Sequence, residues 1–408
     1  MKKEIFFIIA FFCSSTIVNA QMRWWGIYDF EIRKGAENSR IDLNSLPNDY
    51  TQLAVHQVQL GIVSEISSQI SFSAMISNAY ANSFDLKGLE FQLANVTYSH
   101  LLGDWISISA GKMLSPFGAF AKRQLATENP VIGRPLFYTY RQNISPLTGY
   151  LDSAGSTANN QYGSHLTTIY NGGYFSGVEM FGSFFDDLIE YDAAVMNAPL
   201  SSTTGDYNVD GNLAFHGRAA VHPGMWGTIG VSYAFGSFMQ PAELNSYFET
   251  SSAQLNRFEQ STYGIDLQLS YLYYELNAEY ISNRFNAPYI IYNSSYRYVN
   301  GLSNGLSLLL NSDEFLVDVK IEAPFYPGVF LAARYDRLTF GSIIDPQVQS
   351  STYGRSIRWN RNANRYTIGA GYKPDRSVLI KLNYENTDID QTPKPQLNVV
   401  ACSVVVAF

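Results

Sequence analysis

In one polar stretch of the chain, from about residue 114 to residue 172, cationic side chains outnumber carboxylates. Its cations and carboxylates are Lys122, Arg123, Arg134, Arg141, Glu128 and Asp152. The planar donor fork of arginine matches the oxygens of phosphate or carboxylate, and an excess of cations beside a low-dielectric wall attracts anions. The stretch therefore predicts an anion-attracting element. The alternative is that carboxylates elsewhere pair with these cations and hold the stretch in place, and the sequence leaves both open.

The sequence shows no motif that would support catalysis. The five histidines are His56, His100, His165, His216 and His222, and none belongs to a Gly-x-Ser-x-Gly or His-Glu-x-x-His motif. Ser164 and His165 are neighbours, but neighbouring side chains on an extended chain point to opposite faces. Two cysteines cannot supply four thiolates for zinc. We therefore expect no enzymatic activity, no cofactor and no metal site.

The composition narrows the class of protein. Charged residues make up 15% of the 408 residues and aromatic residues another 15%, whereas a typical soluble domain is about 25% charged. The formal net charge of −8 excludes a nucleic-acid binder that must neutralise phosphates. After the N-terminal residues, no apolar run reaches the roughly 18 residues of a membrane-spanning helix. A soluble enzyme and an all-β membrane barrel both remain.

The first twenty residues have the pattern of a secretory signal peptide. Lys2 and Lys3 precede an apolar stretch at residues 5–12, and Val18-Asn19-Ala20 supplies the small residues that signal peptidase recognises. Cleavage after Ala20 leaves a mature chain of residues 21–408. The sequence therefore predicts an exported protein with a signal peptide at residues 1–20.

The mature chain is dominated by alternating apolar and polar residues. One such segment alternates Phe315, Val317, Val319 and Ile321 with Asp318, Lys320 and Glu322. A period of two is typical of β-strands, because successive side chains point to opposite faces. No segment has a convincing helical period, and no change in composition marks a domain boundary. The mature chain is therefore predicted to be a single all-β domain.

Two kinds of connection separate these segments. Seven are short turns, at residues 64–67, 103–104, 186–187, 222–225, 272–274, 323–328 and 373–376. Eight are longer polar stretches, near residues 35–51, 81–87, 114–172, 198–210, 237–260, 286–312, 341–362 and 389–394. This alternation predicts sixteen antiparallel strands in up-and-down order, with both chain ends on the short-turn side. The stretch 114–172 is then the third and longest of the long loops.

Such strands could build a soluble β-sandwich, a propeller or a membrane barrel. Aromatic residues cluster at strand ends, as in the girdles of a transmembrane barrel; they include Trp24, Trp25, Tyr98, Trp105, Trp226 and Tyr271. The last strand has Val400, Cys402, Val404 and Val406 on one face and ends at Phe408, which resembles the C-terminal signal of bacterial outer-membrane barrels. In lipid only a closed barrel leaves no unpaired strand edge. These features favour an antiparallel transmembrane β-barrel of sixteen strands in the bacterial outer membrane.

Eight residues add a more local resemblance. The stretch Gly111-Lys112-Met113-Leu114-Ser115-Pro116-Phe117-Gly118 is similar to the segment that enters the third external loop of phosphate-selective porins. The strand pattern of the whole mature chain resembles bacterial porins in general, and the composition, rich in Asn and Tyr, resembles outer-membrane proteins of the Bacteroidota. The resemblance implies that loop 114–172 folds into the lumen. It also implies that Lys122, Arg123, Arg134 and Arg141 lie at the pore constriction.

The alternation also predicts which charged residues face the lumen. They include Asp29, Glu31, Arg33, Arg218, Asp318, Lys320, Arg334 and Asp336. Over the full set of positions predicted to face the lumen, thirteen carboxylates outnumber seven cations, so an acidic wall opposes a basic loop and the ion preference stays open. The phase of the alternation changes once, within Leu89–Tyr98, where we expect a β-bulge near Ala94-Asn95.

Together these features predict a porin-like channel for passive diffusion of small hydrophilic solutes, with anions as a candidate class. The expected partners are outer-membrane lipid, small polar solutes and either further copies in a homotrimer or other outer-membrane subunits, and not nucleic acid. The alternative is a structural or partner-binding barrel subunit of a larger outer-membrane complex, with a plugged lumen. In that case the aromatic loops 237–260 and 286–312 would contact the partner.

Overall fold

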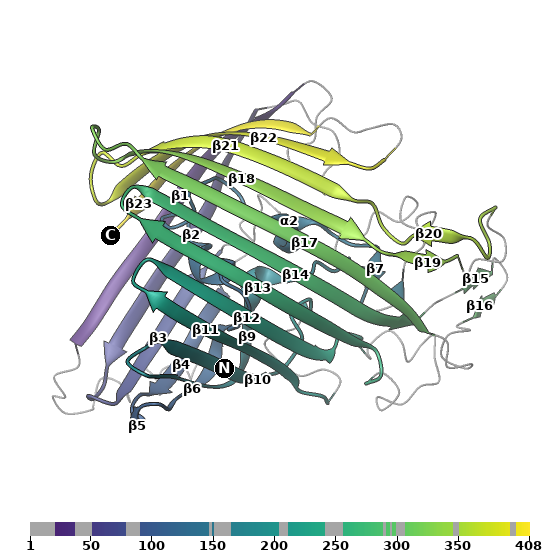
Figure 1. Ribbon diagram of the computed structural model, residues 1–408, viewed down its shortest axis with the longest axis horizontal. Coiled ribbons are helices and arrows are strands. Elements are labelled where there is room, and N and C mark those ends of the chain that lie inside the picture. The colour runs from purple at the N-terminus through teal and green to yellow at the C-terminus, as the bar shows by residue number, and fades with distance from the viewer. Residues whose placement is uncertain are drawn as a thin grey trace, which may run out of the picture.

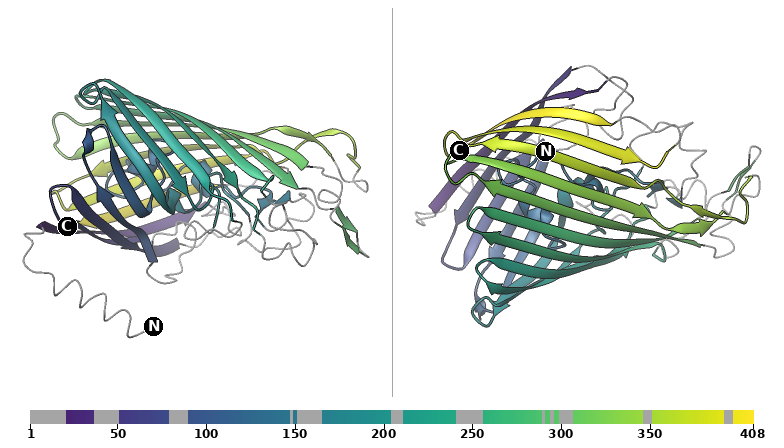
Figure 2. Two further views of the ribbon diagram at one scale, coloured as in Figure 1. Left: turned by 90° about the horizontal axis from the view of Figure 1, so that it is seen from below. Right: turned by 45° about the horizontal axis from the view of Figure 1, so that its top comes forward.

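The computed structural model describes residues 21–36, 51–78, 90–146, 149–150, 165–203, 211–240, 256–288, 291–293, 296–298, 307–345, 351–391 and 397–408. Within these ranges, sixteen antiparallel strands form one closed barrel in up-and-down order (Figures 1 and 2). The fold class expected from the alternation is therefore confirmed. The expected signal peptide at residues 1–20 lies outside the described residues.

The barrel strands are β1 (Gln21–Gly35), β2 (Thr51–Glu65), β3 (Ile70–Ser77), β4 (Glu90–Tyr98), β6 (Ser107–Leu114), β9 (Tyr174–Phe184), β10 (Ile189–Met196), β11 (Ala214–Gly224), β12 (Gly227–Ser237), β13 (Glu259–Tyr271), β14 (Tyr274–Pro288), β17 (Ser307–Glu322), β18 (Val329–Phe340), β21 (Ala363–Tyr372), β22 (Val378–Ile389) and β23 (Asn398–Ala407). The connections contain β5 (Leu101–Asp104), η1 (Phe120–Arg123), α2 (Leu136–Thr139), β7 (Ile144–Ser145), β8 (Gly149–Tyr150), η2 (Asn171–Gly173), β15 (Ile291–Asn293), β16 (Tyr296–Tyr298), β19 (Ser342–Ile344) and β20 (Ser356–Arg358). No helix among the described residues is long and apolar enough to cross a membrane.

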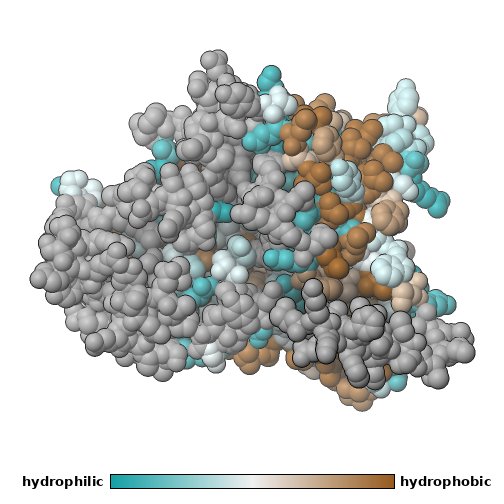
Figure 3. All heavy atoms as spheres, turned by 180° about the vertical axis from the view of Figure 1, so that it is seen from behind, coloured by the Kyte–Doolittle hydropathy of each residue, from teal (hydrophilic) through white to brown (hydrophobic). Residues whose placement is uncertain are grey.

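Each barrel strand separates its side chains into an inner and an outer face. On β17, Leu310, Glu314 and Asp318 are buried on the inside, whereas Phe315 and Ile321 are exposed on the outside. The outer face is therefore mainly apolar, whereas the inner face combines charged and apolar side chains. Figure 3 shows part of that surface, where hydrophobic side chains gather in a patch.

The short turns and the long loops lie at opposite ends of the barrel. The seven short turns and Phe408 are at one end, which we call the turn end (Figure 1). The long connections are at the other end, which we call the loop end. Several turn residues have positive φ, among them Phe185, Asp186, Asp187 and Leu272. Positive φ is the conformation that tight two-residue hairpins require.

The barrel closes between its first and last strands. β23 pairs with β1, and Ile27 lies opposite Ala407. The backbones of Gly26 and Phe408 exchange two hydrogen bonds, of 3.0 and 3.1 Å. The ring of Phe408 covers Gly26 so closely that a Cβ there would lie 2.4 Å from the ring. A larger side chain at position 26 would displace the terminal aromatic ring from this place.

Two details differ from the sequence prediction. The bulge in β4 is at Gln92 and not near Ala94-Asn95, because the register with β3 skips Gln92. The loop predicted at residues 286–312 is shorter, because β14 continues to Pro288 and β17 begins at Ser307. Both extensions keep the strand alternation, with Ala287 and Leu310 buried on the inner face.

Candidate functional site

The long connection between β6 and β9 runs along the inside of the barrel wall. Its described residues are 115–146, 149–150 and 165–173. They form hydrogen bonds with inward-facing side chains of β2, β12, β14, β17, β18, β21 and β22. Helix α2 also contacts β18, and the two lie together in Figure 1. This segment and the wall around it form the candidate functional site.

The residues that carried the family resemblance attach the start of this segment to the wall. Ser115 Oγ lies 2.9 Å from Nδ1 of His216 on β11, and the Gly118 amide donates to Ser232 Oγ at 3.0 Å. The Phe120 amide donates to Oε2 of Glu279 on β14 at 3.2 Å. Gly118 has φ +73°, and a Cβ there would lie 2.1 Å from a Glu279 oxygen. The glycine that ends the motif is therefore needed for close contact with a wall carboxylate.

Lys122 and Arg123, which follow the motif, pair with carboxylates of the wall. Lys122 Nζ lies 3.3 Å from Glu190 and 3.8 Å from Asp192, both on β10, and half of its side chain is exposed. Arg123 lies 3.6 Å from Asp318 on β17 and is largely buried. Burial lowers the pKa of the Arg123 guanidinium, and the charge of Asp318 opposes that shift. The charges of both loop cations thus face opposite charges on the wall.

Residues 126–134, which follow Arg123 in the loop, are held by three cations of the wall. Lys381 on β22 donates to the carbonyl oxygens of Ala126 and Asn129, at 2.9 and 3.3 Å. Arg334 on β18 donates to the Gly133 carbonyl at 3.0 Å. Arg365 on β21 donates at 3.0 Å to the backbone carbonyl of Arg134. Strand parity predicts that these three wall cations face inwards, but their loop partners could not be read from the sequence.

The charged residues expected on the wall are on the inner face, and many pair with one another. Arg334 holds Asp318 with two hydrogen bonds, of 2.6 and 3.0 Å, and Arg218 holds Asp266 with two of 3.0 and 2.7 Å. Planar two-point pairs of this kind are among the stronger polar contacts in proteins. Arg334 and Arg218 are therefore already paired with carboxylates of the wall.

The remaining wall residues form smaller groups. Arg33 donates to Glu31 at 2.6 Å, and Ser403 donates to Asp29 at 2.5 Å. Lys320 lies 2.8 Å from Glu275 and 2.7 Å from Glu322. Asp336 is 2% exposed, and neither of its carboxylate oxygens has a hydrogen-bond partner in the described part of the chain; it lies opposite Arg365 in the sheet register.

Arg134 and Arg141 are placed differently from Lys122 and Arg123. Arg134 lines a cavity of about 20 Å³ between the loop and the wall, together with His56, Asp29 and Lys381. Arg141 is half-buried. Burial raises the pKa of Tyr170, and the positive charge of Arg141 opposes that rise. The four candidate constriction cations therefore lie in different surroundings, and the carboxylates Asp29 and Glu31 line the cavity beside Arg134.

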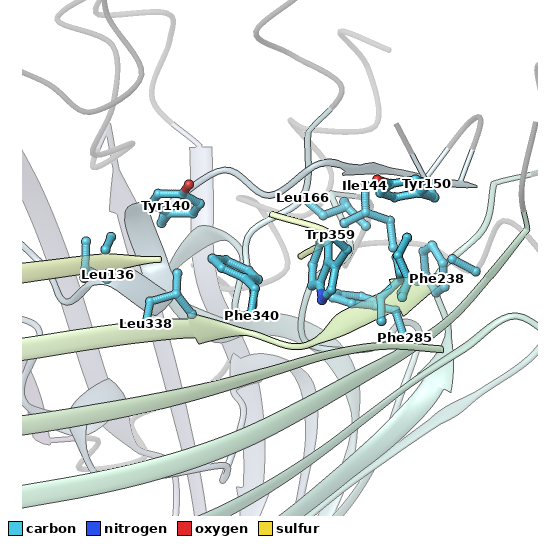
Figure 4. Close-up of a cluster of buried hydrophobic side chains, with 14 of the residues drawn as sticks. Leu136, Tyr140, Ile144, Tyr150, Leu166, Phe238, Phe285, Leu338, Phe340 and Trp359 are labelled. Carbon is cyan, nitrogen blue, oxygen red and sulfur yellow. The ribbon is translucent and has the colours of Figure 1, made fainter. Parts of the chain in front are cut away.

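The later part of the loop is attached by apolar packing. Leu136, Tyr140, Ile144 and Leu166 join one buried cluster with wall and loop-end residues that include Phe285, Phe340 and Trp359 (Figure 4). Trp359 donates its indole N–H to the Asn311 carbonyl at 2.7 Å, and the Tyr140 hydroxyl donates to the Arg361 carbonyl at 3.0 Å. The few polar atoms in the cluster are thus satisfied.

The contact between Ser115 and His216 was not anticipated from the sequence. The two residues are 101 positions apart, and only the path of the loop brings them together. They are 3% and 0% exposed, so a solute in the lumen cannot reach the pair. Ser164 lies outside the described residues, and His165 contacts the Gln142 carbonyl at 2.9 Å. The histidine contacts described here support the loop.

Comparisons with known proteins identify the fold. No family model and no curated protein matches this sequence. Among solved structures, the anion-selective porin from Comamonas acidovorans is 8% identical, with a TM-score of 0.57 over 95% of this chain and 100% of that chain. The channel DcaP of Acinetobacter baumannii is 11% identical, with a TM-score of 0.58 over 95% and 97% of the two chains. Salmonella typhi OmpF in complex with Daunomycin is 11% identical, with a TM-score of 0.57 over 96% and 99%. The chain therefore has the sixteen-stranded porin fold.

Proposed function

We propose that this protein is a bacterial outer-membrane channel through which small hydrophilic solutes diffuse passively, with segment 115–173 as its selectivity element. The observation that carries the proposal is the closed sixteen-stranded barrel with an apolar outer face, a charged inner face and one long connection attached to the inner wall. A barrel of this kind satisfies every strand edge in lipid and offers polar groups to solutes inside. The predicted signal peptide at residues 1–20 and the terminal Phe408 support export and insertion into the outer membrane.

Conductance measurements test this proposal directly. Pure folded protein reconstituted into a planar bilayer should give stepwise conductance increments, whereas the same protein unfolded before addition should give none. Folded protein that inserts into the bilayer and gives no conductance would contradict the channel. Insertion can be checked independently by resistance of the barrel to added protease.

We further propose that Arg134 and Arg141 attract anions at the constriction. Arg134→Glu and Arg141→Glu should each shift the reversal potential in a salt gradient towards cation preference, because each variant replaces a positive charge with a negative one. Unchanged reversal potentials for both variants would contradict a place for these residues at the constriction.

Phosphate selectivity and Bacteroidota origin are finer proposals that rest on the residues of the Gly111–Gly118 stretch and on the composition. Inorganic phosphate added to a chloride solution should reduce the chloride current through the channel if phosphate binds the arginines. Sulfate at the same concentration is the control for simple competition by a divalent anion. Equal effects of phosphate and sulfate would argue against phosphate selectivity.

The second candidate function is a partner-binding barrel with a filled lumen. The apolar cluster of Leu136, Ile144, Phe285 and Trp359 favours it, because this packing fixes the later part of the loop to the wall near the loop end. Purification from the native membrane distinguishes the two. A stoichiometric companion and no conductance would support the partner-binding barrel, whereas a conducting monomer or homotrimer would support the channel.

A further inference from the structure

Residues 122–133 of the long loop are bonded to three sides of the barrel. Lys122 pairs with a carboxylate of β10, the Ala126 amide donates to a glutamine of β2 at 3.1 Å, and the Gly133 carbonyl accepts from an arginine of β18. β2, β10 and β18 are the second, seventh and thirteenth of the sixteen strands in barrel order, so they are five, six and five strands apart around the ring. This short stretch of chain therefore crosses the lumen.

Burial extends around the whole inner wall. Each of the sixteen barrel strands contains at least one side chain that is at most 2% exposed, and several of these are polar, such as Gln59 on β2, Ser109 on β6 and Lys381 on β22. A polar side chain that lined a water-filled lumen would be partly exposed. In the part of the chain that the structure describes, the lumen is therefore filled along some of the length of every strand.

The turn end of the lumen is open to water. A hollow of about 820 Å³ lies there between β6, β9, β10, β11 and β12, and Glu190 and Asp192 are among its lining residues. Both carboxylates face Lys122, whose side chain is half exposed. By contrast, the wall cations Arg334 and Lys381, which bond the same loop from the other side, are buried. Water therefore reaches the loop on its β10 side.

These contacts differ in how easily they separate. An exposed ion pair contributes little to stability and is screened by salt. A buried charge that loses its partner is costly, because water does not replace the lost contact. Lys381 is on β22, which is eight strands from β10 and so directly across the barrel. The loop should therefore separate first from β10, while the buried contacts across the lumen hold it.

We propose that residues 115–134 are a plug that closes the lumen, and that solutes pass only while this plug has separated from β10. The proposal goes beyond the proposed function and rests on it for one point, that the barrel conducts once its lumen is open. A plugged barrel gives brief openings between long closed intervals, whereas an open pore conducts steadily.

Reversible cross-linking tests whether the plug must move. Lys122→Cys/Glu190→Cys places two thiols at the exposed ion pair, in a Cys402→Ser background that removes the free cysteine of the described chain. A bifunctional thiol reagent about as long as the ion pair reaches both positions from the hollow. In planar bilayers the cross-linked protein should lose its openings, and a reducing agent should restore them. Steady conduction that the cross-link leaves unchanged would overturn the proposal.

The matched control is His222→Cys/Glu190→Cys in the same background. His222 Nε2 lies 3.1 Å from Glu190, and the two residues belong to the wall strands β11 and β10. This cross-link occupies the same hollow without holding the plug. The openings of the control should therefore be as frequent after cross-linking as before it.

Thiol modification tests the plug without any need for a current. Val131 lies in the plug and is fully buried against side chains of β18, β22 and β23. Val131→Cys in folded protein should therefore react slowly with a water-soluble thiol reagent. Adding Lys122→Gln should raise the rate by up to about fivefold, because it removes the exposed ion pair that holds the plug to β10.

Arg23→Gln is the control for the modification experiment. It removes an exposed ion pair with Glu65 between β1 and β2, outside the plug, and should leave the rate unchanged. Modification of Val131→Cys as fast as that of an exposed cysteine would overturn the plug. Slow modification that Lys122→Gln accelerates, in a barrel that never conducts, would contradict the proposed function and still support a plug that separates from β10.

Discussion

The two parts of the long loop differ in the share of polar contacts that hold them to the barrel. Residues 115–134 pack Phe117 and Val131 into buried apolar clusters and also form hydrogen bonds with wall residues such as Arg334 and Lys381. Residues 136–144, with Leu166, are held mainly by buried apolar clusters. Polar contacts require particular atom positions, while apolar packing depends mostly on volume and buried area. The polar contacts therefore specify the position of the earlier part more closely than that of the later part.

The largest expected effect is the loss of Arg334. Arg334→Met would leave Asp318 buried without its two-point partner and would remove two contacts with the loop, at Asn129 and Gly133. Breaking a buried pair from one side lowers the free energy of unfolding by about 3–5 kcal/mol. Urea unfolding in lipid vesicles, followed by tryptophan fluorescence, measures the change.

The double variant Arg334→Met/Asp318→Leu is the control for that experiment. It removes both charges, so it should recover part of the stability, as apolar replacements of buried ion pairs do. A double variant that is less stable than Arg334→Met would show that the pair is not the reason for the loss.

A cavity made in the apolar part of the loop should lower the free energy of unfolding. Leu136 is 2% exposed within the cluster, and Leu136→Ala should cost about 3 kcal/mol of unfolding free energy, measured in the same way. Leu136→Met keeps the volume and should cost less than about 1.5 kcal/mol. Similar losses for the two substitutions would mean that packing volume does not hold this part.

A smaller effect is expected where the loop contacts Glu279. Gly118→Ala combines a positive φ with a collision, and we expect a loss of about 1–3 kcal/mol of unfolding free energy. Gly354 has nearly the same φ, +72° against +73°, but open space around it. Gly354→Ala should therefore show the cost of φ alone, about 1 kcal/mol. If the two variants lose the same stability, the contact with Glu279 contributes nothing.

The smallest effect is expected at Lys122. Its side chain is half exposed, so Lys122→Gln should change the unfolding free energy by at most about 1 kcal/mol, and less in high salt. Unfolding curves at low and high sodium chloride measure this dependence. A change that is large or independent of salt would show that Lys122 belongs with the buried contacts of Arg334.

Much of the barrel could be predicted from local patterns. Between Phe315 and Ile321, apolar residues alternate with Asp318 and Lys320, and this period of two separates lipid-facing from inward-facing positions. The two kinds of connection predicted sixteen strands, the number that the barrel has. The bulge at Gln92 was misplaced by two to three residues, because a change of phase in the alternation leaves open which residue the neighbouring strand skips.

Side-chain partners inside the barrel could not be predicted in the same way. The pairs Lys122–Glu190 and Arg123–Asp318 are 68 and 195 residues apart in the chain, and Ser115–His216 are 101 apart. Each pair depends on the stagger of strands around the whole barrel and on the path of the loop within it. The roles of Arg134 and Arg141 at a constriction stay predictions.

The sequence by itself determined the strands, their order and the face on which each charge lies, because a period of two and a tight turn are local properties of the chain. Only the tertiary structure decided that the wall cations Arg334, Arg365 and Lys381 donate hydrogen bonds to carbonyl groups of the loop. It also decided that acidic residues from several strands and turns lie around one hollow at the turn end. Those arrangements depend on closure of the barrel, which brings together residues that no local pattern relates.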